Sequence, residues 1–185
     1  FIPFNIPTFA AMVHELVIAF MLGLIGGVIP GPVLTAIFTE ILQSGFNKSL
    51  RIIFIALVTE TLVAMASLVL FSSLGLSEAF FRGLSVAGAG ILLWIARGIW
   101  RVKSLDRGER MAFSPWKIIL MILANGVLWT YWITICIPKA MLLGEQLKLG
   151  EYLFMGLVQM GWLISTLVVA FLFSVPEFKR LGGSS

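Results

Sequence analysis

The sequence has few of the residues on which enzymes and disulfide-stapled folds depend. It contains one cysteine, Cys136, and one histidine, His14. A single cysteine excludes an intrachain disulfide, a CxxC redox pair and a cysteine-rich metal site. The one histidine has no acidic cluster at ligand spacing, so hydrolytic chemistry and metal binding lack a residue basis. Gly26-Gly27 is followed by no GKS/T, which argues against a phosphate loop. The sequence predicts no enzyme, cofactor or metal centre.

Charge is equally scarce, and apolar residues take its place. Charged residues make up 12% of the chain and hydrophobic residues 59%, with a mean hydropathy of +1.04. Soluble domains contain roughly 45–50% apolar residues, and their apolar runs are shorter than a membrane span. The composition therefore predicts an all-α integral membrane protein that contacts the lipid bilayer. The net charge of +4 comes from Lys and Arg between the apolar runs, where topology explains it, so we assign no nucleic-acid role.

Five apolar runs are long enough to cross a bilayer, each needing about 20 residues. They cover residues 14–43, 49–75, 79–100, 117–143 and 152–174. Ten of the thirteen Lys and Arg residues lie in the linkers after the first, third and fifth runs or within four residues of them. Positive loops stay in the cytoplasm, so we predict the N-terminus outside and the 101–116 loop inside.

Two of the five runs are interrupted. Pro30-Gly31-Pro32 breaks the first, and the fourth is interrupted between Asn125-Gly126 and Pro138. The two are three spans apart, and repeats of three spans must point in opposite directions. This spacing predicts one transmembrane domain over 1–185 with two inverted three-helix repeats, at about 14–100 and 117–174. The second repeat lacks its last helix, so we expect a sixth span in the complete protein.

The proline break is a candidate binding site. Proline removes an amide donor and clashes with the carbonyl one turn earlier. In hydrocarbon the freed backbone groups must meet protein, water or a ligand, and the half-helix from Pro32 offers free amides and a positive dipole end to an anion. The alternative is a kink packed against its neighbours.

Polar residues indicate a lined path through the spans. Thr35 and Thr39 share a face after the break, and Gln159 shares one with Trp162 and Thr166 in the fifth span. Each set could equally join helices by hydrogen bonds.

Glu60 lies near the middle of the second span, where an ionised carboxylate costs several kcal/mol and no Lys or Arg is available at that depth. A buried acid of this kind suits proton coupling, and the alternative is a protonated structural Glu. Glu40, closer to the cytoplasmic end, is a second coupling candidate unless it is solvated or pairs with Lys48 or Arg51.

These motifs resemble the LysE/RhtB family of amino-acid exporters. The match rests on Ile29-Pro30-Gly31-Pro32, Ser44-Gly45-Phe46, Thr59-Glu60, Asn125, the aromatic stretch from Trp129 to Trp132, and Pro138. Gly126 departs from the proline that usually follows the family's asparagine, which leaves the position of the second break open.

The resemblance implies export of an amino acid or similar small metabolite across a prokaryotic inner (plasma) membrane by proton antiport. The substrate-binding residues it implies, together with the polar pattern, are Pro30, Gly31, Pro32, Thr35, Thr39, Asn125, Trp129, Trp132, Pro138 and Gln159. A divalent-cation exporter and a non-transporting membrane assembly subunit are the alternatives. The small-residue face of the third span is compatible with a homodimer.

Overall fold

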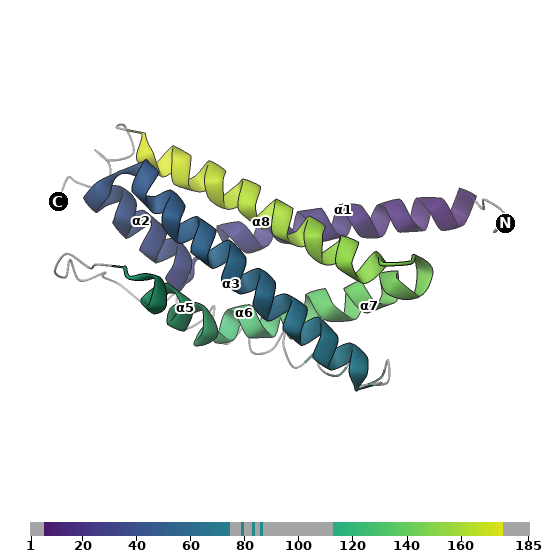
Figure 1. Ribbon diagram of the computed structural model, residues 1–185. Helices are drawn as coiled ribbons and strands as arrows, with labels where there is room; N and C mark the ends of the chain where they lie inside the picture. Colours follow the sequence, from purple (N-terminus) through teal and green to yellow (C-terminus); the bar gives the residue numbers. More distant parts are fainter. Residues whose placement is uncertain (1–5, 75–78, 80–82, 84–85, 87–112, 176–185) are drawn as a thin grey trace.

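The computed structural model describes residues 6–74, 79, 83, 86 and 113–175, and this part of the chain is helical with no strand. Figure 1 shows helices lying roughly along one long bundle, with α5, α6 and α7 following one another on one side of it. The elements are α1 (Ile6–Val28), α2 (Pro32–Ser44), α3 (Phe46–Ser73), α5 (Pro115–Leu123), α6 (Gly126–Tyr131), the π-helical turn η1 (Trp132–Cys136), α7 (Ile137–Gln146) and α8 (Gly150–Ser174).

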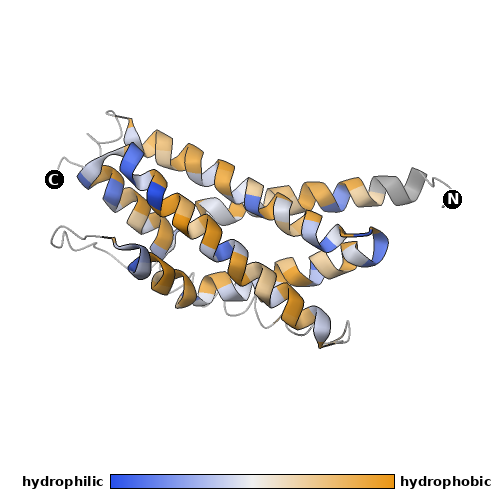
Figure 2. Ribbon diagram, viewed as in Figure 1, coloured by the Kyte–Doolittle hydropathy of each residue, from blue (hydrophilic) through white to orange (hydrophobic). Residues whose placement is uncertain are grey.

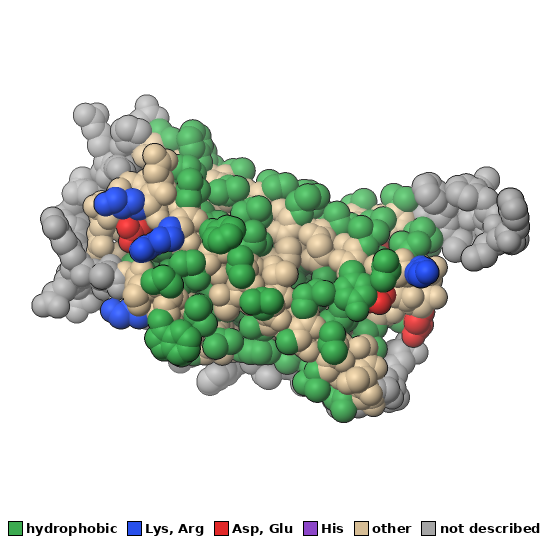
Figure 3. Space-filling view, in the orientation of Figure 1, with side chains coloured by type: hydrophobic (Ala, Val, Ile, Leu, Met, Phe, Trp, Pro, Cys, Tyr) green, Lys and Arg blue, Asp and Glu red, His purple; other side chains and the backbone are tan. Residues whose placement is uncertain are grey.

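Four of these helical stretches are long and apolar enough to cross a membrane. They are Ala11–Val28, Phe46–Ser73, Gly126–Gln146 and Gly150–Ser174. Hydrophobic residues cover most of their length (Figure 2), and on the face in Figure 3 the charged side chains lie toward the two ends. The prediction of an all-α protein with apolar spanning helices is confirmed for the described residues. The third predicted span, at 79–100, lies almost entirely outside them.

The helices that flank the breaks are unequal in length. α1 has 23 residues and α2 has 13, whereas α5 has only 9 and the continuous helix after it has 21. At about 1.5 Å per residue, α1 alone is roughly 34 Å long, enough to cross the hydrocarbon core. The helix that carries the first span begins at Ile6, eight residues before the predicted boundary at 14, and its apolar stretch of spanning length begins at Ala11.

Close backbone contacts hold α1 against α8. A Cβ on Gly27 would collide with the side chains of Ser165 and Thr166, and one on Gly161 would collide with the carbonyl of Phe20. Glycine lets membrane helices approach closely without a side chain between them. α1 and α8 run in the same direction and form the most tightly packed pair in the described bundle.

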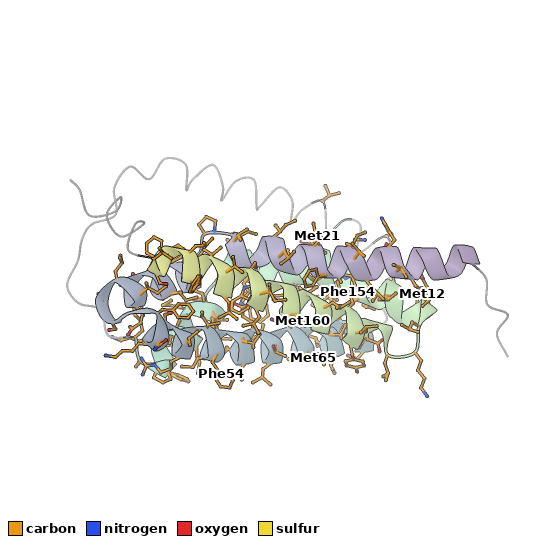
Figure 4. The ribbon with its side chains drawn as sticks, turned by 90° about the horizontal axis from the view of Figure 1, so that it is seen from above. Met12, Met21, Phe54, Met65, Phe154 and Met160 are labelled. Carbon is orange, nitrogen blue, oxygen red and sulfur yellow. The ribbon has the colours of Figure 1, made fainter. Side chains whose placement is uncertain are left out.

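Two buried apolar clusters lie at different depths. One, here called the α7–α8 core, includes Ala64, Trp132, Phe154 and Val158 and lies toward the turn between α7 and α8. The other, called the α2–α3 core, lies toward the turn at Gly45 and includes Ile37, Ile52, Ala56, Ile118 and Ala170. By contrast, Met21 on α1 and Phe54 on α3 lie on opposite sides of the bundle in Figure 4, 50% and 66% exposed, as lipid-facing residues would be.

Candidate functional site between two helix breaks

The first break follows from its two prolines. α1 ends at Val28 and α2 starts at Pro32, with Gly31 in an extended conformation. In a continuous helix the carbonyls of Gly26 and Val28 would accept from residues 30 and 32, which as prolines have no N–H. Other groups satisfy part of the break: Thr166 Oγ1 donates to the Gly27 carbonyl at 3.3 Å, and the Thr35 amide to that of Gly31 at 3.0 Å.

The second break forms without a proline. Asn125 is the N-cap of α6, and its Oδ1 accepts from the Leu128 amide at 3.4 Å. On the other side, Trp129 Nε1 donates to the carbonyl of Leu123, the last residue of α5, at 2.8 Å. The first amides of a helix have no carbonyl partner in a preceding turn. A short polar side chain that accepts from one of them is sufficient to start the helix. The break therefore lies at Ala124–Asn125, at the start of the predicted 125–138 interval.

The two breaks border one cavity of about 70 Å³. Every described long helix contributes to its wall, and a Cβ on Gly31 would lie 3.9 Å from Asn125 Nδ2. The lining residues are Gly23, Gly26, Gly27, Ile29, Pro30, Gly31, Val33, Leu34, Ile37, Glu60, Asn125, Val127, Leu128, Tyr131, Trp132, Val158, Trp162 and Thr166. The volume has room for about five water molecules, so it suits a small ligand.

The cavity lies between the two apolar cores. On α3, Glu60 is one turn from Ala56 of the α2–α3 core and one turn from Ala64 of the α7–α8 core. On α8, Thr166 lies between Val158 of one core and Ala170 of the other. Leu128, which lines the cavity, packs against both cores. Polar groups and helix breaks thus occupy a middle layer with apolar material on either side.

Several buried polar groups in this layer have no partner among the residues that the structure describes. Glu60 is 3% exposed, and within the described chain no hydrogen bond or ion pair reaches its carboxylate. Trp132 Nε1 and both amide atoms of Gln159 are also buried without a hydrogen bond. A buried polar group without a partner costs about 1–3 kcal/mol, which a ligand or water removes by binding. The helices that start at Pro32 and Asn125 also point their positive dipole ends at this layer.

Five of the predicted site residues line the cavity, and they come from three segments of the chain, the first break, α3 and the helix that begins at the second break: Pro30, Gly31, Glu60, Asn125 and Trp132. Gln159 is not part of the lining, but the residue before it, Val158, and the residue one turn later, Trp162, both are. Residues 95 positions apart in the chain, such as Pro30 and Asn125, therefore share one site.

The predicted polar face of α2 points away from the cavity. Thr35 is exposed, and Thr39 Oγ1 donates to the Thr35 carbonyl at 2.8 Å within the same helix. The cavity side of α2 is apolar instead and presents Val33, Leu34 and Ile37. A threonine that bonds to its own backbone carries no exposed donor, so it can face lipid at little cost. Four-residue spacing identified a common face but could not show which way that face points.

Four other predicted site residues lie outside the cavity lining. Pro32 starts α2 and does not line the cavity, and Trp129 is engaged with the Leu123 carbonyl. Glu40 is 8% exposed, beside the α2–α3 core and away from the cavity, so it is not solvated. In the described chain Arg51 does not pair with Glu40, and its Nη2 donates to the Phe113 carbonyl at 2.9 Å. Pro138 lies in the first turn of α7, inside a helix that continues past it.

Tyr131 was not chosen from the sequence as a site residue. Its ring lines the cavity, and its Oη donates to the Leu22 carbonyl of α1 at 2.7 Å. A phenol inside an apolar span is the signal that could have singled it out, because such a hydroxyl needs a partner. Trp162 and Thr166 shared a face with Gln159 in the sequence, and they are the members of that set that reach the cavity.

No family model, curated protein or solved structure matches this chain. Within residues 6–74 and 113–175, no group of three or more His, Cys, Asp or Glu side chains could hold a metal ion. The function must therefore be argued from the cavity itself.

Proposed function

We propose that this chain is a secondary membrane transporter that moves an amino acid or a similar small metabolite through the cavity between its two broken helices. The observation that carries the proposal is the middle layer, where one small cavity is lined by two helix breaks and by Glu60 and Trp132, whose buried polar groups have no partner among the described residues. Non-helical backbone is tolerated at membrane depth where it lines a cavity. Substrate sites of secondary transporters form at such discontinuous helices.

The two apolar cores support alternating access. A transporter must close its site on one side before opening it on the other, and each core is an apolar barrier on one side of the cavity. The breaks at Ile29–Gly31 and Ala124–Asn125 are the positions where the backbone can bend without loss of helical hydrogen bonds. Rocking of one half of the bundle against the other would then expose the cavity to each side in turn.

The chemistry of the cavity supports a small polar substrate. The Glu60 carboxylate can accept from an ammonium group, while Trp132 Nε1 and the helix starts at Pro32 and Asn125 can donate to a carboxylate. No described Lys or Arg lines the cavity. The resemblance to the LysE/RhtB exporters is the reason for naming amino acids, and it also favours export by proton antiport, with Glu60 as the group that carries the proton.

The membrane topology belongs to the same proposal. The described Lys48, Arg51 and Lys117 lie at or near the α2–α3 end of the bundle, which would face the cytoplasm, and the α7–α8 turn would face outward. The helices that follow the two breaks, α2 and α6–α7, run from the cavity toward opposite ends of the bundle (Figure 1), and such opposite directions suit two inverted repeats. A homodimer and an inner-membrane location complete the proposal.

Reconstituted efflux is the direct test. Proteoliposomes loaded with a panel of radiolabelled amino acids, and with divalent cations in parallel, would be given an inward-directed proton gradient. We expect the gradient to accelerate release of one or more amino acids. Glu60→Gln should lower that release to the rate seen without a gradient, since the amide cannot carry a proton. Glu145→Gln, an exposed position on α7, is the matched control and should behave as wild type. Gradient-driven flux that survives Glu60→Gln would disprove the coupling role.

A further inference from the structure

The π-helical turn η1 inserts one extra residue into the helix that follows the second break. The Ile137 amide donates to the Trp132 carbonyl, five residues back, whereas an α-helix uses the residue four back. Pro138 is the second residue after this turn, following Ile137. In an α-helix its ring would clash with the Thr134 carbonyl, and a wider turn removes that clash. Single π turns of this kind occur frequently at functional sites.

The same helix is joined to α1 by two polar links. Tyr131 Oη donates to the Leu22 carbonyl at 2.7 Å, and Lys139 Nζ pairs with Glu15 Oε2 at 3.0 Å. The residues on α1 are seven apart (22 − 15), but those on the other helix are eight apart (139 − 131). Two α-helical turns contain about 7.2 residues. The seven-residue spacing matches two turns of α1. The eight-residue spacing on the other helix matches two turns only because the π turn η1 holds one residue more than an α-helical turn. The π turn therefore sets the register in which both links form.

The turn is also in contact with the cavity. Trp132 is its first residue and lines the cavity, and its buried Nε1 has no partner in the described part of the chain. The ring of the adjacent Tyr131 lines the cavity too. A ligand that accepts a hydrogen bond from Trp132 Nε1 would act directly on η1. The links to α1 lie on the α7–α8 side of the cavity, where α1 and α7 close the bundle.

We propose that η1 is the switch of a gate on the α7–α8 side of the cavity. Conversion of η1 to an α-helix would turn Lys139 by about 100° relative to Tyr131, because each residue of an α-helix covers that angle. Lys139 would leave Glu15, and α7 could then move away from α1 and open the cavity. Pro138 favours the π form and so holds the gate closed. This inference rests on the transport function proposed above.

Cys136 provides the measurement, because it lies inside η1 and is fully buried. Its labelling by a small membrane-impermeant thiol reagent would be followed in proteoliposomes. Pro138→Ala and Lys139→Ala should each raise the labelling rate about fivefold, since loss of a weak link shifts a two-state population by about that factor. Lys148→Ala removes an exposed charge at the same end and should leave the rate unchanged.

A charge exchange keeps the test independent of folding. Glu15→Lys alone should raise labelling, and Glu15→Lys combined with Lys139→Glu should return it to the wild-type rate. Equal labelling in wild type, Pro138→Ala and Lys139→Ala would overturn the gate, as would failure of the exchange to restore the rate. If labelling changes as expected but no amino acid is transported, the proposed substrate is wrong and the gate stands.

Discussion

The two helix breaks that border the cavity are built in different ways. The first relies on prolines, which withdraw the donors that the carbonyls of Gly26 and Val28 would need. The second relies on side chains: Asn125 caps the start of α6, and Trp129 satisfies the end of α5. Both produce an unwound segment beside the same cavity, so proline is sufficient for a break but not required.

The surroundings of the breaks differ as well. The first is fixed in place by the α1–α8 contact, in which Gly27 has no room for a side chain. At the second, a Cβ on Gly126 would meet no atom within 4 Å. We infer that packing holds the first break and local hydrogen bonds hold the second. Three substitutions test this difference.

The largest effect is expected for Gly27→Ala. The added methyl would collide with the Ser165 hydroxyl and with the Trp162 carbonyl, so α1 and α8 must separate, and overpacking of this kind costs about 1–3 kcal/mol. Unfolding in mixed micelles of mild detergent and dodecyl sulfate would measure it. Gly126→Ala is the matched control, also a glycine next to a break, and should not destabilise the protein. Equal loss at both positions would mean that the α1–α8 contact does not distinguish the breaks.

A smaller loss is expected for Asn125→Ala. Removal of the side-chain oxygen leaves the Leu128 amide unpartnered, which costs about 1 kcal/mol at a helix start. The same unfolding assay applies, and Asn125→Asp should retain most of the stability because aspartate also caps helices. Should Asn125→Ala be as stable as wild type, the cap would not be what maintains the second break.

The smallest effect, and a favourable one, is expected for Gly126→Pro. Gly126 is the first residue of α6, where proline fits, and Asn125 already has the extended conformation that a residue before proline adopts. The substitution should stabilise the protein by about 0.4–1 kcal/mol, because proline lowers the conformational entropy of the unfolded chain. Thermal unfolding in detergent would measure the gain. A clear loss of stability would show that the Gly126 amide has a partner that proline removes.

The sequence by itself determined the class of the protein and the location of its first break. Apolar runs of spanning length specify membrane helices because the bilayer core has a fixed thickness, and Pro30 and Pro32 interrupt a helix in any surroundings. The depth of Glu60 was also readable from the sequence, since it follows from counting residues along one apolar run. These features are local, and residue type alone decides them.

Only the tertiary structure decided which faces meet. Thr35 and Thr39 turned outward while Val33 and Ile37 turned inward, and the Thr39 hydroxyl tolerates this position because it is bonded to the Thr35 carbonyl of its own helix. Pro138 proved to lie within a continuous helix, because a π turn relieves its clash. Tyr131 reached the Leu22 carbonyl of α1 through a contact that depends on the packing of two segments 109 positions apart in the chain. A single helix defines the spacing of its side chains, but its neighbours determine which of them line a cavity.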